Sequence, residues 1–223
     1  MKIRTPFCYI EVEYLFLIFS FICVLSNRIR NYFISFYMCY LFIIFHELAH
    51  ILVASIFGKK LEVFKLSLSG VNAKFEREKY KDKDDTNYWS NVLIYFAGPF
   101  SNFILALLFH NNSFILETNL SLAIINIIPT YPLDGYNILK NTLGKWNNDS
   151  WLYLIENITI IVLISIAVYQ LIYVKSITIL LFTIYILILK SERKNCQKSL
   201  KYRQKIHVKK MLQLNDKNIT NFK

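Results

Sequence analysis

The sequence predicts an all-α polytopic membrane protein with about six transmembrane helices and a small β-hairpin beside the second of them. Hydrophobic residues make up 55% of the 223 positions, and the chain contains 18 Phe and 15 Tyr, which is unusual for a soluble domain. Long apolar runs recur along the chain and are separated by short polar segments. This pattern is typical of helices that cross a lipid bilayer several times.

Six apolar runs are candidates for these transmembrane helices. The first and the last are short for a hydrocarbon core of about 30 Å, so five spans remain the alternative to six. Lys2 and Arg4 precede the first run, as in a signal peptide, but no small-residue cleavage pattern follows it. We therefore expect a retained anchor. The runs cover residues 14–26, 32–57, 88–109, 114–133, 151–173 and 176–189.

Basic residues predict the orientation of the helices. Eight Lys or Arg lie between Gly58 and Tyr88 and eleven follow Leu189, whereas the opposite connections contain three. Because an excess of positive charge marks the cytoplasmic side, both termini and the middle loop are expected there. A tail lying near anionic lipid accounts for these charges, and a docking surface for an acidic protein is the alternative. Nucleic acid is not an expected partner.

The loop after the second run contains a predicted β-hairpin. Residues 61–75 alternate partly between apolar and polar side chains, with a Ser-Gly break between the two halves. An exposed edge of such a hairpin can bind an unwound peptide by strand addition. A lid that only packs over a cavity is the alternative.

The second run contains His46, Glu47 and His50, which are costly to bury in hydrocarbon. Positions i and i+4 of a helix differ by about 40° of rotation and one turn, so both imidazoles can bind one Zn²⁺. Glu47 can act as a general base, as in the His-Glu-x-x-His motif of metal-dependent proteases. The alternative is a purely structural role, as a buried histidine pair or an interhelical ion pair, without metal binding or catalysis. His50 lies about 12 Å below the predicted cytoplasmic surface, so water must enter from that side.

A zinc enzyme needs a third protein ligand, and the segment 126–135 offers Asp134. Pro129 and Pro132 are expected to stop the incoming helix after about 15 residues, or roughly 22 Å. The irregular backbone that follows must face protein or a water-filled cavity. Asp134 then lies near the depth of the two histidines, and Gly135 permits a turn that aims its carboxylate at the metal.

These motifs resemble the site-2 protease family of intramembrane zinc metalloproteases, peptidase M50. The resemblance covers about residues 1–212 and is strongest toward the branch that contains the bacterial stage IV sporulation protein FB. Pro99 within one motif must disturb the third helix, so we expect this motif to shape the cavity wall, with Asn102 as a weak candidate. The matching motifs are His46-Glu47-x-x-His50, Ala97-Gly98-Pro99-Phe100-Ser101-Asn102 and Asn126-x-x-Pro129-x-x-Pro132-Leu133-Asp134-Gly135, in this order.

The resemblance implies a catalytic site with one zinc ion per chain. His46, His50 and Asp134 would be the zinc ligands, and Glu47 would be the base that activates water. Asn126 would line the active site and donate its side-chain amide to the substrate or to the developing oxyanion, which is physically reasonable for an amide.

The reaction that the resemblance implies is hydrolysis of a peptide bond in or near the bilayer. By analogy with the sporulation branch, the substrate is the precursor of a sporulation sigma factor, which loses its amino-terminal pro-segment. The same analogy implies a bacterial cell membrane, the membrane around the forespore, and inhibitory membrane proteins as partners. The alternatives are a site-2 protease with another membrane substrate, a catalytically silent scaffold, and a metal transporter that uses the same metal site.

The predicted domain organisation departs from the family pattern. Residues 1–190 are expected to form the membrane-embedded metalloprotease domain, with the zinc core at about 32–145, and residues 191–223 a basic cytoplasmic tail. The tail leaves no room for the CBS domain of the sporulation branch, and the middle loop leaves none for a PDZ domain. Tyr136 follows Gly135 where the family often has a second glycine, so the packing behind the ligand need not follow the family.

Overall fold

The computed structural model describes residues 2–5, 8–25, 30–67, 70–75, 88–144, 149–196 and 199. The chain divides into two compact units between Thr159 and Ile160, inside one helix. Most of the predicted tail, 197–223, lies outside the described residues apart from residue 199, and so does the charged stretch 76–87. The helices are α1 (Tyr14–Leu25), α2 (Arg30–Ile56), α3 (Tyr88–Leu108), α4 (Ser113–Ile127), α5 (Asp134–Gly144) and α6 (Asp149–Tyr169), followed by the π-helical segment η3 (Gln170–Val174). Residues 178–196 are also helical.

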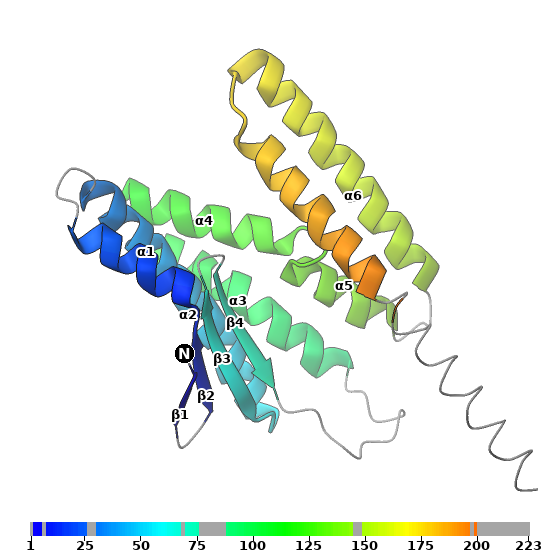
Figure 1. Cartoon of the computed structure of the whole chain (residues 1–223). Coiled ribbons are helices and arrows are strands. Elements are labelled where there is room, and N and C mark those ends of the chain that lie inside the picture. The colour runs from blue at the N-terminus through cyan, green and yellow to red at the C-terminus, as the bar shows by residue number, and fades with distance from the viewer. Residues whose placement is uncertain are drawn as a thin grey trace, which may run out of the picture. The chain divides into compact units, whose positions relative to one another are not determined.

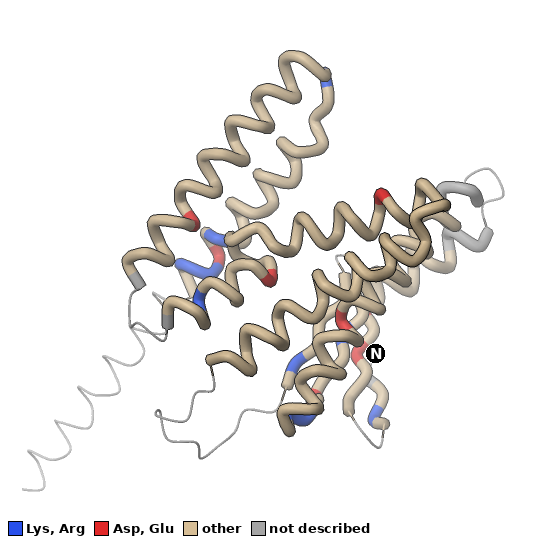
Figure 2. The backbone as a smooth tube through the Cα atoms, turned by 180° about the vertical axis from the view of Figure 1, so that it is seen from behind, with Lys and Arg blue, Asp and Glu red and all other residues tan. Residues whose placement is uncertain are grey.

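Three helical segments are long and apolar enough to cross a membrane, namely Phe33–Ile56, Tyr88–Leu108 and Ser150–Val174. They coincide with the second, third and fifth predicted runs. Charged residues are sparse along these helices in Figure 2, and α3 contains none. The apolar helix α4 has 15 residues and α1 has 12, so six spans stay a prediction.

The fold is mostly helical but also contains a four-stranded sheet, which is larger than the predicted hairpin (Figure 1). The predicted hairpin corresponds to β3 and β4, and residues 68 and 69 at its tip lie outside the described residues. The strands β1 and β2 were not predicted. The strands are β1 (Lys2–Arg4), β2 (Tyr9–Val12), β3 (Leu61–Ser67) and β4 (Gly70–Phe75), and they lie in this order.

The sheet joins two antiparallel pairs through one parallel pair. β1 pairs with β2 and β3 pairs with β4 in antiparallel fashion, whereas β2 and β3 are parallel, with Ile10 opposite Phe64. A parallel pair needs a crossover connection, and here the crossover consists of α1 and α2. An ion pair of 2.5 Å between Lys65 of β3 and Glu13 at the end of β2 supports this pairing.

The tip of the β3–β4 hairpin is fastened to α2 by Tyr40. The Tyr40 hydroxyl donates a hydrogen bond to the Ser67 carbonyl at 3.0 Å and lies 3.4 Å from the Gly70 carbonyl. The Ser67 hydroxyl also donates to the Gly70 carbonyl, at 2.8 Å. Backbone carbonyls away from water are costly to leave unpaired, so these hydroxyls stabilise the turn. The tip of the hairpin therefore lies beside the part of α2 that precedes His46.

Helix α3 is the central helix of the first unit and packs against α2, α4 and α5. The helix is continuous across Pro99, which membrane helices tolerate where neighbouring groups satisfy the freed backbone. Most of its buried residues recur at spacings of three or four and therefore lie on one side of the helix. They are Ser90, Ile94, Ala97, Gly98, Pro99, Asn102 and Ala106. The small residues among them allow close approach of the neighbouring helices.

The second unit contains the end of α6, η3 and the helical residues 178–196, and the two helical arms run alongside each other in Figures 1 and 2. Lys175 adopts a left-handed conformation with φ 56° and donates its N–H to the Gln170 carbonyl, which ends η3. The buried side chains of this unit include Ile160, Leu163, Ala167, Thr183 and Ile186. Large apolar side chains cover the outer faces of both arms, as expected for helices in lipid.

Candidate metal centre

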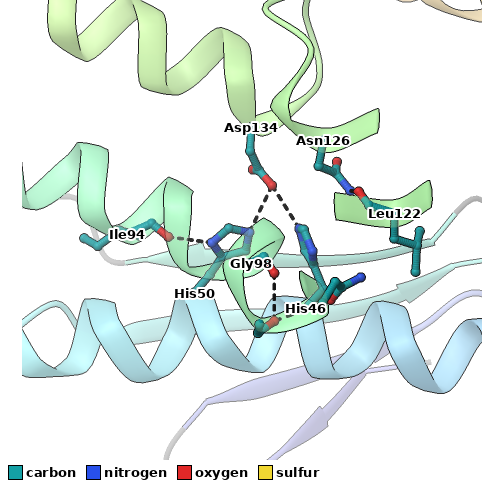
Figure 3. Close-up of polar contacts among 9 residues, drawn as sticks. His46, His50, Ile94, Gly98, Leu122, Asn126 and Asp134 are labelled. Atoms are coloured by element: carbon teal, nitrogen blue, oxygen red, sulfur yellow. Dashed lines mark hydrogen bonds and ion pairs between the residues drawn. The ribbon is translucent and has the colours of Figure 1, made fainter. Parts of the chain in front are cut away.

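Three side chains from two helices converge in the first unit (Figure 3). His46 and His50 lie one turn apart on α2, and Asp134 is the first residue of α5. The Asp134 Oδ2 atom lies 2.9 Å from His46 Nε2 and 3.2 Å from His50 Nε2. All three side chains are largely shielded from solvent, with the histidines 5% and 6% exposed. The structure thus brings together the three residues that were predicted as metal ligands.

The donor atoms of this cluster suit a zinc ion. Two imidazole nitrogens and one carboxylate oxygen are a common ligand set of catalytic zinc sites. Ligand bonds of about 2.0–2.1 Å to a tetrahedral ion place the ligand atoms about 3.3 Å apart. The nitrogen–oxygen distances of 2.9 and 3.2 Å are close to this value, and one ligand atom from each residue can be chosen so that all lie within 4.8 Å. Three protein ligands leave a fourth position for water or substrate.

A hydrogen bond to α3 orients His50. His50 Nδ1 lies 2.6 Å from the Ile94 carbonyl oxygen, which can only accept. His50 therefore carries a proton on Nδ1, which leaves Nε2 as the atom that can bind a metal ion. On His46, the Nδ1 atom is buried and has no hydrogen-bond partner among the described residues. The two histidines thus differ in how firmly their rings are fixed.

Gly98 provides the space in which the two imidazoles lie. A Cβ atom at this position would be 2.6 Å from His46 Nε2 and would also collide with the His50 ring. Any larger residue would displace both metal-facing nitrogens, so the glycine is part of the site. The sequence analysis assigned the surrounding motif only to the cavity wall. The signal it did not use is a glycine next to a proline inside an apolar helix.

The segment between α4 and α5 places Asp134 at the cluster. α4 ends at Ile127, two residues before Pro129, after the predicted 15 residues. Gly135 was predicted to form a turn that aims the Asp134 carboxylate at the metal. This prediction was wrong, because Gly135 lies within the first turn of the helix α5. A Cβ atom there would collide with the Ile127 backbone, so the glycine allows the start of α5 to approach the end of α4. Tyr136 behind it is 4% exposed and makes an edge contact with Tyr131.

The predicted catalytic residues lie around the cluster in different settings. Glu47 is half-buried beside His46, and its carboxylate accepts a hydrogen bond from the backbone of Ala73 in β4. Asn126 lies near the end of α4 and donates its amide to the Leu122 carbonyl of its own helix at 3.0 Å. Asn102 is fully buried on α3. Within the described part of the chain, neither asparagine hydrogen-bonds to the three predicted ligands.

Comparisons with known proteins agree with this geometry. Residues 34–117 match the family model described as Peptidase family M50, and this segment includes both histidines, Glu47 and α3. No curated protein matches the sequence. Among solved structures, the chain is similar to "Site-2 Protease from Methanocaldococcus jannaschii" with 21% identity and a TM-score of 0.52. That similarity covers 86% of this chain and 94% of the other, and it concerns the fold.

The metal cluster adds one residue to the family match, because Asp134 lies outside the matched segment. The matched segment ends at residue 117, whereas Asp134 is brought to the two histidines by the fold of the segment beyond it. The apolar helices add that the protein is integral to a membrane. Residues 34–117 are therefore similar to peptidase family M50, and the chain shares its fold with a site-2 protease.

Proposed function

We propose that the chain is an intramembrane protease that uses His46, His50 and Asp134 to bind one zinc ion and Glu47 as its general base. The observation that carries the proposal is the convergence of these three ligand candidates from two helices, with Glu47 in the same turn of α2. When bound, zinc would lower the pKa of a coordinated water and polarise the scissile carbonyl. The chain itself supplies the fixed ligand geometry and the proton acceptor.

Glu47 would move protons during peptide hydrolysis. As a base it accepts a proton from the attacking water, and as an acid it returns this proton to the nitrogen of the departing amine. The hydrogen bond from the Ala73 backbone holds the carboxylate on the side of α2 that faces the sheet. The half-buried setting limits the access of bulk water to this proton transfer.

The edge of β4 is a suitable place for the substrate. β4 is the last strand in the sheet order, and among the described residues no strand pairs with its outer edge. Alternate residues of an edge strand direct their backbone groups outward, and Ala73 directs its N–H toward Glu47. An unwound substrate segment that pairs with this edge would lie beside the general base. Asn126 would donate a hydrogen bond from its amide to this substrate if the amide turned away from the Leu122 carbonyl.

The substrate we propose is the precursor of a sporulation sigma factor, from which the enzyme would remove the amino-terminal pro-segment. This assignment is supported by the resemblance of the three motifs to the stage IV sporulation protein FB branch. It fits an enzyme with both termini and its middle loop in the cytoplasm, which the basic residues favour. The location would be the membrane around the forespore, and inhibitory membrane proteins would be the partners.

Co-expression with a tagged sigma factor precursor tests the proposal. The intact enzyme should remove the pro-segment, whereas Glu47→Gln should abolish processing and still bind one zinc ion per chain. Glu62→Gln, an exposed glutamate in β3, is the matched control and should process normally. Processing by Glu47→Gln would overturn the assignment of the base. A zinc-loaded enzyme that cleaves another membrane protein but not this precursor would overturn the substrate alone.

A further inference from the structure

A chain of hydrogen bonds connects the end of α2, the start of α3 and the middle of α5. The Lys59 ammonium donates to Asn91 Oδ1 of α3. Asn91 Nδ2 donates to Asn141 Oδ1 of α5 at 3.1 Å, and Asn141 Nδ2 donates to the Asn137 carbonyl at 2.7 Å. These three elements are the ones that form the metal centre or line it. Nothing in the reaction described above uses this chain.

The two end groups of this hydrogen-bond series, the Lys59 ammonium and the Asn137 carbonyl, fix the donor and the acceptor of every bond between them. Lys59 can only donate, so the Asn91 atom that faces it must be the amide oxygen. The Asn91 NH₂ group then faces Asn141, which must present its own oxygen and direct its NH₂ group to the Asn137 carbonyl. Each amide has one arrangement that satisfies all partners. Such fully directed polar networks hold packed elements in one register.

The end of α2 places Lys59 for this contact. The Gly58 N–H bonds to the Ser55 carbonyl, and the Lys59 N–H bonds to the Ala54 carbonyl, which together form a Schellman motif. Gly58 has φ +76°, the left-handed conformation that this helix ending requires. The helix therefore ends at a defined residue, and the next side chain turns back to α3.

The hydrogen-bond chain lies two helical turns from the metal centre on both helices. Asn141 follows Asp134 by seven residues on α5, and Asn91 precedes Gly98 by seven residues on α3. Seven residues are nearly two full turns, so each pair shares one face of its helix. The interface between α3 and α5 is thus held at one end by the Asn91–Asn141 bond. At its other end, Asp134 meets the histidines that lie against Gly98.

We propose that Asn91 and Asn141 are positioning residues that dock α5 on α3 and so preorganise Asp134 as the third zinc ligand. This inference rests on the proposed metal site. The two histidines lie on one long helix, whereas Asp134 begins α5, a separate helix that follows a short irregular segment, so its position depends on how α5 packs. The Asn91–Asn141 bond therefore determines the fraction of metal-free molecules in which the Asp134 carboxylate already lies beside the two histidines.

A double-mutant cycle with zinc binding as the readout tests the inference. The variants are Asn91→Ala, Asn141→Ala and the double variant, and zinc affinity is measured by competition with a chromophoric chelator in detergent. Each single variant should bind zinc about tenfold more weakly, since loss of outer hydrogen bonds commonly costs 10–100-fold in affinity. The double variant should bind no more weakly than either single one, because both remove the same bond. Thr142→Ala, an exposed neighbour on α5, is the control and should bind normally.

Two further measurements separate positioning from a general loss of stability. At limiting zinc the Asn91→Ala and Asn141→Ala variants should lose proteolysis, and saturating zinc should restore kcat. Thermal unfolding of the metal-free variants should stay within a few degrees of the intact protein. Equal zinc affinity in all variants would overturn the inference, as would activity that saturating zinc fails to restore. Absence of zinc binding by the intact protein would instead overturn the proposed metal site.

Discussion

Gly98 determines whether the two histidines can share one metal ion. Its missing side chain leaves room for the ends of two imidazoles, which a Cβ atom would push apart. Gly98→Ala is expected to weaken zinc binding at least tenfold, measured by chelator competition. Phe100→Leu alters an exposed side chain two residues further along α3 and should bind zinc normally. Normal zinc affinity in Gly98→Ala would contradict this prediction, because it would show that the His46 and His50 rings can shift without weakening zinc binding.

Gly135 is expected to respond differently to the same substitution. The atoms that a Cβ would meet there belong to the Ile127 and Ile128 backbone, which cannot rotate away as a side chain can. Gly135→Ala should therefore destabilise the metal-free protein by about 1–3 kcal/mol, the usual cost of overpacking, whereas Gly98→Ala should change it much less. Thermal unfolding of both variants without zinc measures this difference. Equal melting temperatures would contradict it.

At the scale of elements, the hairpin depends on its attachment to α2. Tyr40→Phe removes the hydroxyl that bonds the Ser67 carbonyl and should cost about 1 kcal/mol in local stability of the hairpin tip. If the edge of β4 binds the substrate, KM should rise severalfold while zinc affinity stays unchanged. Tyr37→Phe, a neighbouring tyrosine on α2, serves as the control. A change in zinc affinity would instead point to a role for Tyr40 in the metal centre.

The sequence predicts the long helices of this protein well and the short strands poorly. The runs 32–57 and 88–109 differ from α2 and α3 by at most two residues, because each apolar run has polar residues at both ends. The strands β1 and β2 have three and four residues, too few for alternation to be visible. The partner of β2 also lies about 50 residues away, a pairing that no local pattern encodes.

The candidate site was predictable where spacing or covalent chemistry decides the outcome. The four-residue spacing of His46 and His50 implies one shared face, and the two prolines limit the length of α4. The roles of Gly98 and of the Ile94 carbonyl were not predictable, because they depend on which residues of α3 lie opposite α2. The Asn126 amide bonds to the Leu122 carbonyl of its own helix, which the motif alone did not indicate.

For the whole molecule, the basic residues predict an orientation that can be measured. A reporter fused after Lys223 should lie in the cytoplasm, whereas a reporter inserted at Asn111, between α3 and α4, should lie on the opposite side. Paired reporters that are active on opposite sides of the membrane measure this directly. Two reporters on the same side would contradict the three crossings predicted between Asn111 and Lys223 and would require a new assignment of the spans.

The parallel pairing of β2 with β3 also sets an order of events during synthesis. Strand β2 leaves the ribosome about 50 residues before its partner, so it must wait unpaired while α1 and α2 enter the bilayer. Asp134 emerges later still, 84 residues after His50. The newly made protein therefore completes its sheet before it can bring its three candidate metal ligands together, and a nascent chain that stops short of α5 would carry a paired hairpin without the carboxylate of this cluster.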